Sequence, residues 1–463
     1  MDNSKKRKLY FYLTLLFLFI CVLTFIFLNQ GNITPAEPKT SEGSIIDSFL
    51  KQLADNSHHK LSLLILQIGV IVIFARGFGY LFKKFNQPAV IGEITAGIVL
   101  GPSILGMFFP GVFSYIFPDE SLVYLQLLSQ IGLIVYMFVI GMDLDIHLIR
   151  KDMSSAVLIS HASIIIPYLL GIILSYYIYK DFSPPGISFL SFALFMGIAM
   201  SITAFPVLVR IIKERKMENT HIGVLTITCA ASDDVTAWCI LAVVVAIVKA
   251  GGITGAIFTI VLALAYVVFM LLFIKPFLKK LDEKYFSKKN PNTGIIALTM
   301  LLMLFSAFLS EVIGIHAIFG AFLAGIVMPQ NKPFKKLIAQ KIETISLVLL
   351  IPVFFVVTGL KTEIGLLNSG YLWFVCIAIL LVAVAGKLGG SALTAKFIGL
   401  SWKNALTIGI LMNTRGLMEL IVLNVGYDEG ILTKEIFSMM VIMALVTTFM
   451  AGPALGLIRN SAE

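Results

Sequence analysis

Apolar stretches of about twenty residues recur along this 463-residue chain, and they set the strongest limit on what it can fold into. Such a stretch matches the length of an α-helix that crosses a lipid bilayer, where only helices and closed barrels satisfy their backbone polar groups. Only 13% of the residues are charged, against roughly 25% in typical soluble domains. The chain is therefore predicted to be an all-α polytopic membrane protein.

Thirteen of these segments follow residue 60. They cover residues 61–82, 89–109, 121–141, 154–178, 186–212, 220–248, 253–275, 293–310, 313–329, 341–361, 370–398, 403–426 and 431–457. A further apolar run at residues 9–28 follows four consecutive basic residues. This run is longer than the apolar core of about 7–15 residues in a signal peptide, so it is predicted to be an N-terminal membrane anchor helix. We expect residues 1–60 to form this anchor and an external loop, and residues 61–463 to form the transmembrane domain.

The basic residues explain the formal net charge of +9 without a nucleic-acid site. They lie in short loops between apolar segments, and no basic face with interleaved aromatic residues is found. If the N-terminus is cytoplasmic, 25 of the 35 lysines and arginines fall in cytoplasmic loops and 7 in external ones. Cytoplasmic loops of membrane proteins carry this excess of basic residues. Both termini are therefore expected to face the cytoplasm, and the membrane is expected to be the plasma (inner) membrane.

Two consecutive acidic residues, Asp233 and Asp234, lie in the middle of the apolar segment at residues 220–248. One acidic side chain near the bilayer centre costs roughly 2.5–3.5 kcal/mol on insertion scales. A helix end at the membrane surface would avoid that cost, but about ten apolar residues flank the pair on each side. The pair therefore indicates a pathway for ions or protons.

Short strings recur at a spacing of seven segments. Residues 96–102 (AGIVLGP) resemble residues 324–329 (AGIVMP), and residues 139–146 (VIGMDLDI) resemble residues 357–364 (VTGLKTEI). An odd spacing gives the two copies opposite orientations in the membrane. This is the inverted repeat of many secondary transporters.

The same spacing pairs two segments that are interrupted in mid-span. One interruption runs from Ser201 to Pro206, and the other covers residues 413–416. Pro206 removes a backbone donor, and Gly416 weakens the helix that contains it. Broken helices at matching positions point to a transporter's binding site, because their free carbonyls can coordinate a cation. Thr203 is either such a cation contact or bonds back to its own helix.

Two further pairs of charges are expected within the membrane. Arg415 and Glu419 are four residues apart, so they share a helix face and can pair. Lys387 has about a dozen apolar or small residues on each side, too many for it to reach the membrane surface. It needs a carboxylate partner or loses its proton. Neighbouring helix positions point about 100° apart, so one of Asp233 and Asp234 can pair with Lys387 while the other faces a water-filled cavity.

Together these motifs resemble the monovalent cation:proton antiporter family, in particular its double-aspartate branch of sodium/proton and plant cation/proton exchangers. The resemblance covers residues 61–457, and the matching strings are Thr203-Ala204-Phe205-Pro206, Ser232-Asp233-Asp234, Lys387 and Asn413-Thr414-Arg415-Gly416-Leu417-Met418-Glu419-Leu420. It implies a core domain of two inverted repeats with two crossed broken helices, and a dimerisation domain. It also implies homodimers and an elevator-like alternating-access motion.

The resemblance implies roles for single residues as well. Asp234 would bind the monovalent metal cation and the proton in turn, while Asp233 pairs with Lys387. The other candidate residues are Thr203 and Ser232 for cation or proton binding, and Arg415, Glu419 and Asn413 for support of the broken helices.

The expected function is secondary active exchange of sodium or potassium for protons, with no cofactor. A monovalent cation channel is the alternative, because channels also line their pores with acidic groups. A channel would leave the inverted repeat and the buried lysine unexplained. An enzyme is not expected, since the apolar segments contain no nucleophile with a base and no set of metal ligands at a suitable spacing.

Overall fold

The computed structural model describes residues 59–85, 87–143, 153–218, 220–249, 253–281, 293–329 and 345–460, together with Phe49, Gln52, Asn56 and Ile342. Residue contacts divide the chain into two compact units, residues 1–59 and 60–463. The predicted anchor helix at residues 9–28 lies outside the described residues, as does most of the predicted external loop.

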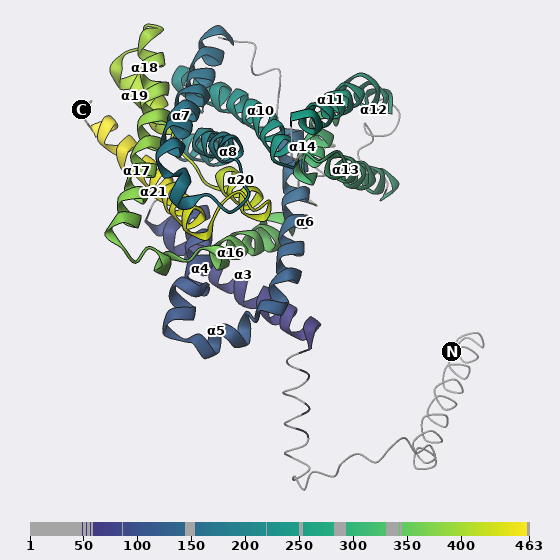
Figure 1. Ribbon diagram of the computed structural model, residues 1–463. Helices are drawn as coiled ribbons and strands as arrows, with labels where there is room; N and C mark the ends of the chain where they lie inside the picture. Colours follow the sequence, from purple (N-terminus) through teal and green to yellow (C-terminus); the bar gives the residue numbers. More distant parts are fainter. Residues whose placement is uncertain are drawn as a thin grey trace, which may run out of the picture. The chain divides into compact units, whose positions relative to one another are not determined.

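Every regular element in the described part of the second unit is helical (Figure 1). The α-helices are α3 (Lys60–Lys84), α4 (Ala89–Leu100), α5 (Pro110–Ile116), α6 (Asp119–Asp143), α7 (Met153–Phe182), α8 (Phe189–Ser201), α9 (Phe205–Glu214), α10 (His221–Lys249), α11 (Ile253–Phe269), α12 (Lys275–Leu281), α13 (Thr293–Ile313), α14 (Ala317–Val327), α16 (Ile351–Lys361), α17 (Gly370–Val384), α18 (Gly390–Phe397), α19 (Trp402–Met412), α20 (Leu417–Asp428) and α21 (Lys434–Asn460). Short π-helical turns are η2 (Pro102–Gly106), η4 (Met270–Ile274), η7 (Ser346–Leu350) and η9 (Ala385–Gly389), and η8 (Ile364–Leu366) is a 3-10 turn.

These helices account for the thirteen segments predicted after residue 60. Among the described residues, eleven helical spans are long and apolar enough to cross a membrane, the bent pair α19–α20 forms a twelfth, and α14 is a shorter apolar helix. The span at residues 257–281 contains the window of 18 residues with the highest mean hydropathy, 3.0, and only 11% of that window is buried. Such an exposed apolar surface suits contact with lipid. The predicted all-helical membrane fold is confirmed.

The internal repeat appears as two equivalent helix crossings. On α4, Gly97 packs against the backbone of Gly359 on α16. On α14, Gly325 packs against the backbone of Gly141 on α6. Neither crossing leaves room for a Cβ atom, because backbone atoms of the partner helix occupy that space. The four glycines are those of the recurring strings, so each string pair supplies one glycine to each crossing.

Both predicted helix interruptions occur where the sequence places them. Helix α8 ends at Ser201 and α9 begins at Phe205, whereas α19 ends at Met412 and α20 begins at Leu417, with a bend of 42°. Gly416 has a φ of 140°, which side chains with a Cβ rarely adopt. The N–H of Ala204 donates to the carbonyl of Thr414 over 3.0 Å, so the two breaks lie side by side.

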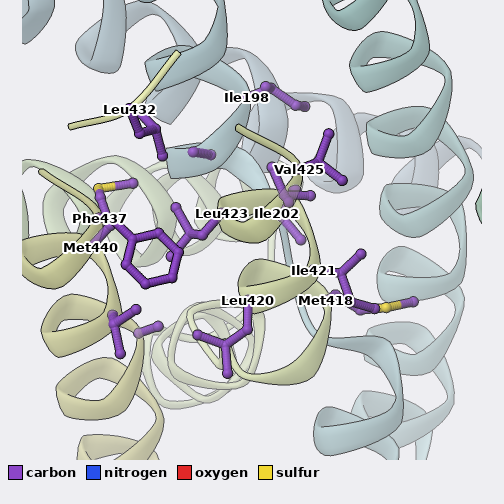
Figure 2. Close-up of a cluster of buried hydrophobic side chains, with 14 of the residues drawn as sticks. Ile198, Ile202, Met418, Leu420, Ile421, Leu423, Val425, Leu432, Phe437 and Met440 are labelled. Carbon is purple, nitrogen blue, oxygen red and sulfur yellow. The ribbon is translucent and has the colours of Figure 1, made fainter. Parts of the chain in front are cut away.

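Apolar packing holds the half-helices in place. All residues of α20 from Leu417 to Gly426 are buried, as expected for a helix enclosed by other helices. Figure 2 shows side chains of α20 packed with side chains of α8, of α21 and of the residues next to these two helices. The labelled residues are Ile198, Ile202, Met418, Leu420, Ile421, Leu423, Val425, Leu432, Phe437 and Met440. In Figure 1, α11, α12 and α13 lie to the right of α8 and α20, and α17, α18 and α19 lie to their left. The interrupted helices are therefore central among the described helices.

Candidate functional site

A fully buried ion pair joins α10 to the segment formed by α17, η9 and α18. Lys387 Nζ lies 2.7 Å from Asp233 Oδ2, and neither side chain is exposed. Lys387 belongs to the π-helical turn η9, where Gly386 packs against the backbone of Pro167 on α7. Irregular turns of this kind occur often at functional sites. The structure thus brings Lys387 to Asp233, the partner that the resemblance implies.

Asp233 accepts hydrogen bonds from three hydroxyl groups as well. Ser160 Oγ donates to Oδ1 over 3.1 Å, Ser163 Oγ donates to Oδ2 over 3.2 Å, and Thr203 Oγ1 lies 2.5 Å from Oδ2. The structure therefore places Thr203 on the ion-paired carboxylate. Ser160 and Ser163, both on α7, are absent from the predicted set. Their spacing of three residues within an apolar segment puts them on one helix face and was the available signal.

Asp234, the next residue on α10, has quite different surroundings. It is fully buried, and neither carboxylate oxygen accepts a hydrogen bond of ordinary geometry from a described residue, although the indole of Trp238, one turn further along α10, lies close to it. Buried polar atoms are nearly always hydrogen-bonded, and an unpaired buried charge is strongly unfavourable. A carboxylate in this position can reach a stable state by binding a proton or a cation.

Two cations bond to the C-terminal end of α8. Arg415 Nη1 donates to the carbonyl of Ala199 over 2.9 Å, and its Nη2 donates to the carbonyl of Met200 over 2.5 Å. Lys387 Nζ donates to the carbonyl of Ser201. The last carbonyls of a helix lack partners within it and carry partial negative charge. Arg415 and Lys387 thus donate hydrogen bonds to the backbone carbonyls that the interruption leaves without helical partners at the end of α8.

The remaining polar groups of the second break are buried. Arg415 Nη1 lies 2.8 Å from Glu419 Oε2, and both side chains are fully buried. Asn413 is 3% exposed. No described residue bonds to Asn413 Oδ1, Glu419 Oε1 or Arg415 Nε. The structure therefore brings Arg415 and Glu419 together, whereas Asn413 keeps a free oxygen beside them in the chain.

Ser232 lies on another side of α10. It is half-buried and lines a cavity of about 480 Å³ together with Trp238 and Cys239 of α10, Tyr266 of α11 and Phe319 of α14. Its side chain therefore faces α11 and α14, away from the ion pair. Within the described ranges, no group of three or more His, Cys, Asp or Glu side chains is arranged to hold a metal ion. The acidic site is instead a pair of carboxylates, one of them neutralised by Lys387.

Comparison with known proteins identifies the family to which this chain belongs. The sequence pattern of the sodium/hydrogen exchanger transmembrane family matches residues 69–460. The chain belongs to this family of integral membrane transporters, which confirms the family predicted from the motifs.

Individual relatives agree with this assignment. The chain is 43% identical over 394 residues to the Na(+)/H(+) antiporter NhaS4 of Synechocystis sp. (strain ATCC 27184 / PCC 6803 / Kazusa), covering 85% of this chain and 96% of that protein. It is 37% identical over 404 residues to cation/H(+) antiporter 19 of Arabidopsis thaliana, covering 87% of this chain and 50% of that protein. It is 32% identical over 408 residues to K(+)/H(+) antiporter 1 of Saccharomyces cerevisiae (strain ATCC 204508 / S288c), covering 86% and 46%. The chain thus spans about half the length of the plant and yeast relatives.

A solved structure shares the fold. The sodium proton antiporter MjNhaP1 from Methanocaldococcus jannaschii, solved at pH 8, superposes with a TM-score of 0.64 at 15% sequence identity, covering 86% of this chain and 98% of that one. This likeness supports the helix arrangement.

Proposed function

We propose that this protein exchanges a monovalent cation, sodium or potassium, for protons by alternating access. The observation that carries the proposal is the pair of adjacent buried carboxylates, of which Asp233 is fully bonded and Asp234 has no ion-pair partner among the described residues. Relatives named as sodium/proton, cation/proton and potassium/proton antiporters support the same function.

In this mechanism a cation and a proton compete for Asp234. Because Lys387, Ser160, Ser163 and Thr203 already bond to Asp233, the positive charge of Lys387 is directed to that carboxylate. Asp234 must be neutralised by something that comes from solution. A site that is always occupied by one ion or the other, and that opens to each side in turn, exchanges ions without a leak.

The domain movement is part of the proposal. The transmembrane domain works as a homodimer in the plasma (inner) membrane, with both termini in the cytoplasm, and a core domain with the crossed breaks moves against the rest. The side-by-side breaks of α8–α9 and α19–α20 support a core that moves as one body. The distribution of basic residues between the two sets of loops supports the orientation.

Proton movement in proteoliposomes tests the proposal. Vesicles that contain the wild-type protein and a pH-sensitive dye are expected to respond to added sodium, potassium or lithium, and Asp234→Asn is expected to abolish the response. Asp181→Asn is the matched control, since Asp181 is an exposed carboxylate that accepts a hydrogen bond from Tyr371. It is expected to keep wild-type exchange.

Asp234→Asn is expected to fold, because it removes a buried carboxylate that has no ion-pair partner. Thermal unfolding checks this point. Exchange that survives in the folded Asp234→Asn protein contradicts the role of Asp234. Cation flux through the wild-type protein without any proton movement would favour the channel alternative.

A further inference from the structure

A second cavity, of about 460 Å³, lies at one end of the described helices, and its lining residue Ile222 precedes Asp233 by eleven residues on α10. It is formed where α9 and α21 end and where α10 and α19 begin. Two kinds of side chain line it: the cations Arg215, Lys216 and Lys403, and the apolar residues Ile222, Leu455 and Ile458.

The three cations of this cavity form no ion pair with the carboxylates that the structure describes. Arg215 is held in place, because its Nη2 donates to the carbonyl of Gly452 on α21 over 2.9 Å. Lys216 and Lys403 are exposed. Three positive charges around one cavity repel one another, and a bound anion would relieve this repulsion.

The helix directions add to the positive potential. Helix α10 begins next to Thr220, whose Oγ1 accepts from the N–H of Gly223 over 3.0 Å. Helix α19 begins next to Ser401, whose Oγ accepts from the N–H of Asn404 over 3.3 Å. Thr220 and Asn404 both line the cavity. Two helix N-termini, which carry partial positive charge, therefore open at the same cavity as the three cations.

The apolar wall indicates the kind of anion. Ile222, Leu455 and Ile458 would gain nothing from a small hydrated anion, but they suit the first methylene groups of an acyl chain or a glycerol backbone. The helices that form the cavity belong to membrane spans that begin or end at this place, and lipid headgroups lie at that depth. Basic pockets between transmembrane helices bind phosphate-containing headgroups.

We propose that the cavity between α9, α10, α19 and α21 binds the phosphate headgroup of an anionic phospholipid. The bound lipid would join α9 to α19, which are the half-helices on one side of the two breaks, and would hold both against α10, which carries Asp233 and Asp234. The proposal concerns binding and does not depend on the exchange function.

Lipid binding to the purified full-length protein in a neutral detergent tests the proposal. Short-chain phosphatidylglycerol, phosphatidylcholine and inorganic phosphate are titrated separately, and the bound lipid is counted by native mass spectrometry while the unfolding temperature is recorded. The test variant is Lys216→Gln with Lys403→Gln. The control is Lys279→Gln with Lys280→Gln, which removes the same charge from two exposed lysines of α12.

Phosphatidylglycerol is expected to bind and to stabilise the wild-type and control proteins, and phosphatidylcholine is not. The test variant is expected to bind phosphatidylglycerol about 25-fold more weakly, from about 5-fold for each basic residue removed. Unfolding temperatures measured without lipid show whether a variant is destabilised in general. In that case the single variant Lys216→Gln is used, and it is expected to bind phosphatidylglycerol about 5-fold more weakly than wild type. If phosphatidylglycerol binding were weakened equally in the test and control proteins, the lipid would be attracted by the overall positive charge and not by this cavity, and the proposed site would be overturned. Stabilisation by inorganic phosphate alone, lost in the test variant, would keep an anion site but overturn the lipid as its occupant.

Discussion

The N–H of Ala204 and the carbonyl of Thr414 are joined by a 3.0 Å hydrogen bond, although the two residues belong to different interrupted spans. Each break exposes backbone groups that a continuous helix would satisfy. Here one break supplies a donor and the other an acceptor. The two interruptions therefore stabilise each other, and substitutions at one break should affect the other.

Lys387→Met is expected to lower the free energy of unfolding by about 3–5 kcal/mol, because it leaves the Asp233 carboxylate buried without its cation. Methionine keeps much of the length of the lysine side chain. Thermal or denaturant unfolding in detergent measures the loss. The double variant Lys387→Met with Asp233→Asn removes the stranded charge and is expected to recover most of the stability. A double variant no more stable than Lys387→Met would show that the ion pair is not what the single variant disrupts.

Thr203→Val is expected to destabilise the protein by about 1–3 kcal/mol, because Asp233 Oδ2 loses a hydrogen bond from a buried hydroxyl. Valine keeps the shape of threonine, and Thr203→Ser keeps the hydroxyl. Unfolding and exchange kinetics are compared for both variants. If Thr203 acts only through Asp233, the KM for the cation stays near the wild-type value in Thr203→Val. A KM that rises tenfold or more without loss of stability would instead identify Thr203 as a cation contact.

Arg415→Lys is expected to destabilise the protein by about 1–3 kcal/mol, although the charge is kept. A lysine ammonium cannot replace the planar guanidinium that reaches Ala199, Met200 and Glu419 at once. Exchange activity should fall with stability, since the end of α8 loses its partners. Arg76→Lys is the control, because Arg76 makes an exposed bond to the carbonyl of Leu347. An equal loss of stability in Arg415→Lys and Arg76→Lys would argue against a special role of the planar guanidinium of Arg415.

Gly359→Ala is expected to destabilise the protein by about 1–3 kcal/mol, because the added methyl group meets the backbone of α4 at Gly97. The repeat predicts a similar loss for Gly325→Ala, where the added methyl group meets the backbone of α6. Gly111→Ala has open space around the new methyl group and is the control, with an expected change within about 0.5 kcal/mol. Unfolding temperatures of the three variants measure these effects. A tolerated Gly359→Ala would mean that α4 and α16 can move apart at little cost.

The internal repeat and the interruptions could be predicted from the sequence because they depend on local features. The length of an apolar run decides whether a helix can cross a membrane, and Pro206 or Gly416 interrupts a helix whatever packs around it. The recurring strings likewise indicated the repeat, but the helix crossings that their glycines form became apparent only in the structure. Charges at mid-span also stand out in the sequence, because an apolar setting makes them costly.

The partners of the charged residues were decided by tertiary structure. From the residues alone either aspartate could face Lys387, and only the rotation of α10 against its neighbours puts Asp233 there and Ser232 beside α11 and α14. Ser160 and Ser163 complete the ion pair from 70 or more residues away. Arg415 was expected to pair with Glu419, but its bonds to the end of α8 span more than 200 residues. Sequence by itself determined which segments enter the membrane and where they break, since those properties follow from neighbouring residues. Which side chain meets which depends on how the helices pack and rotate, and that is a property of the whole chain.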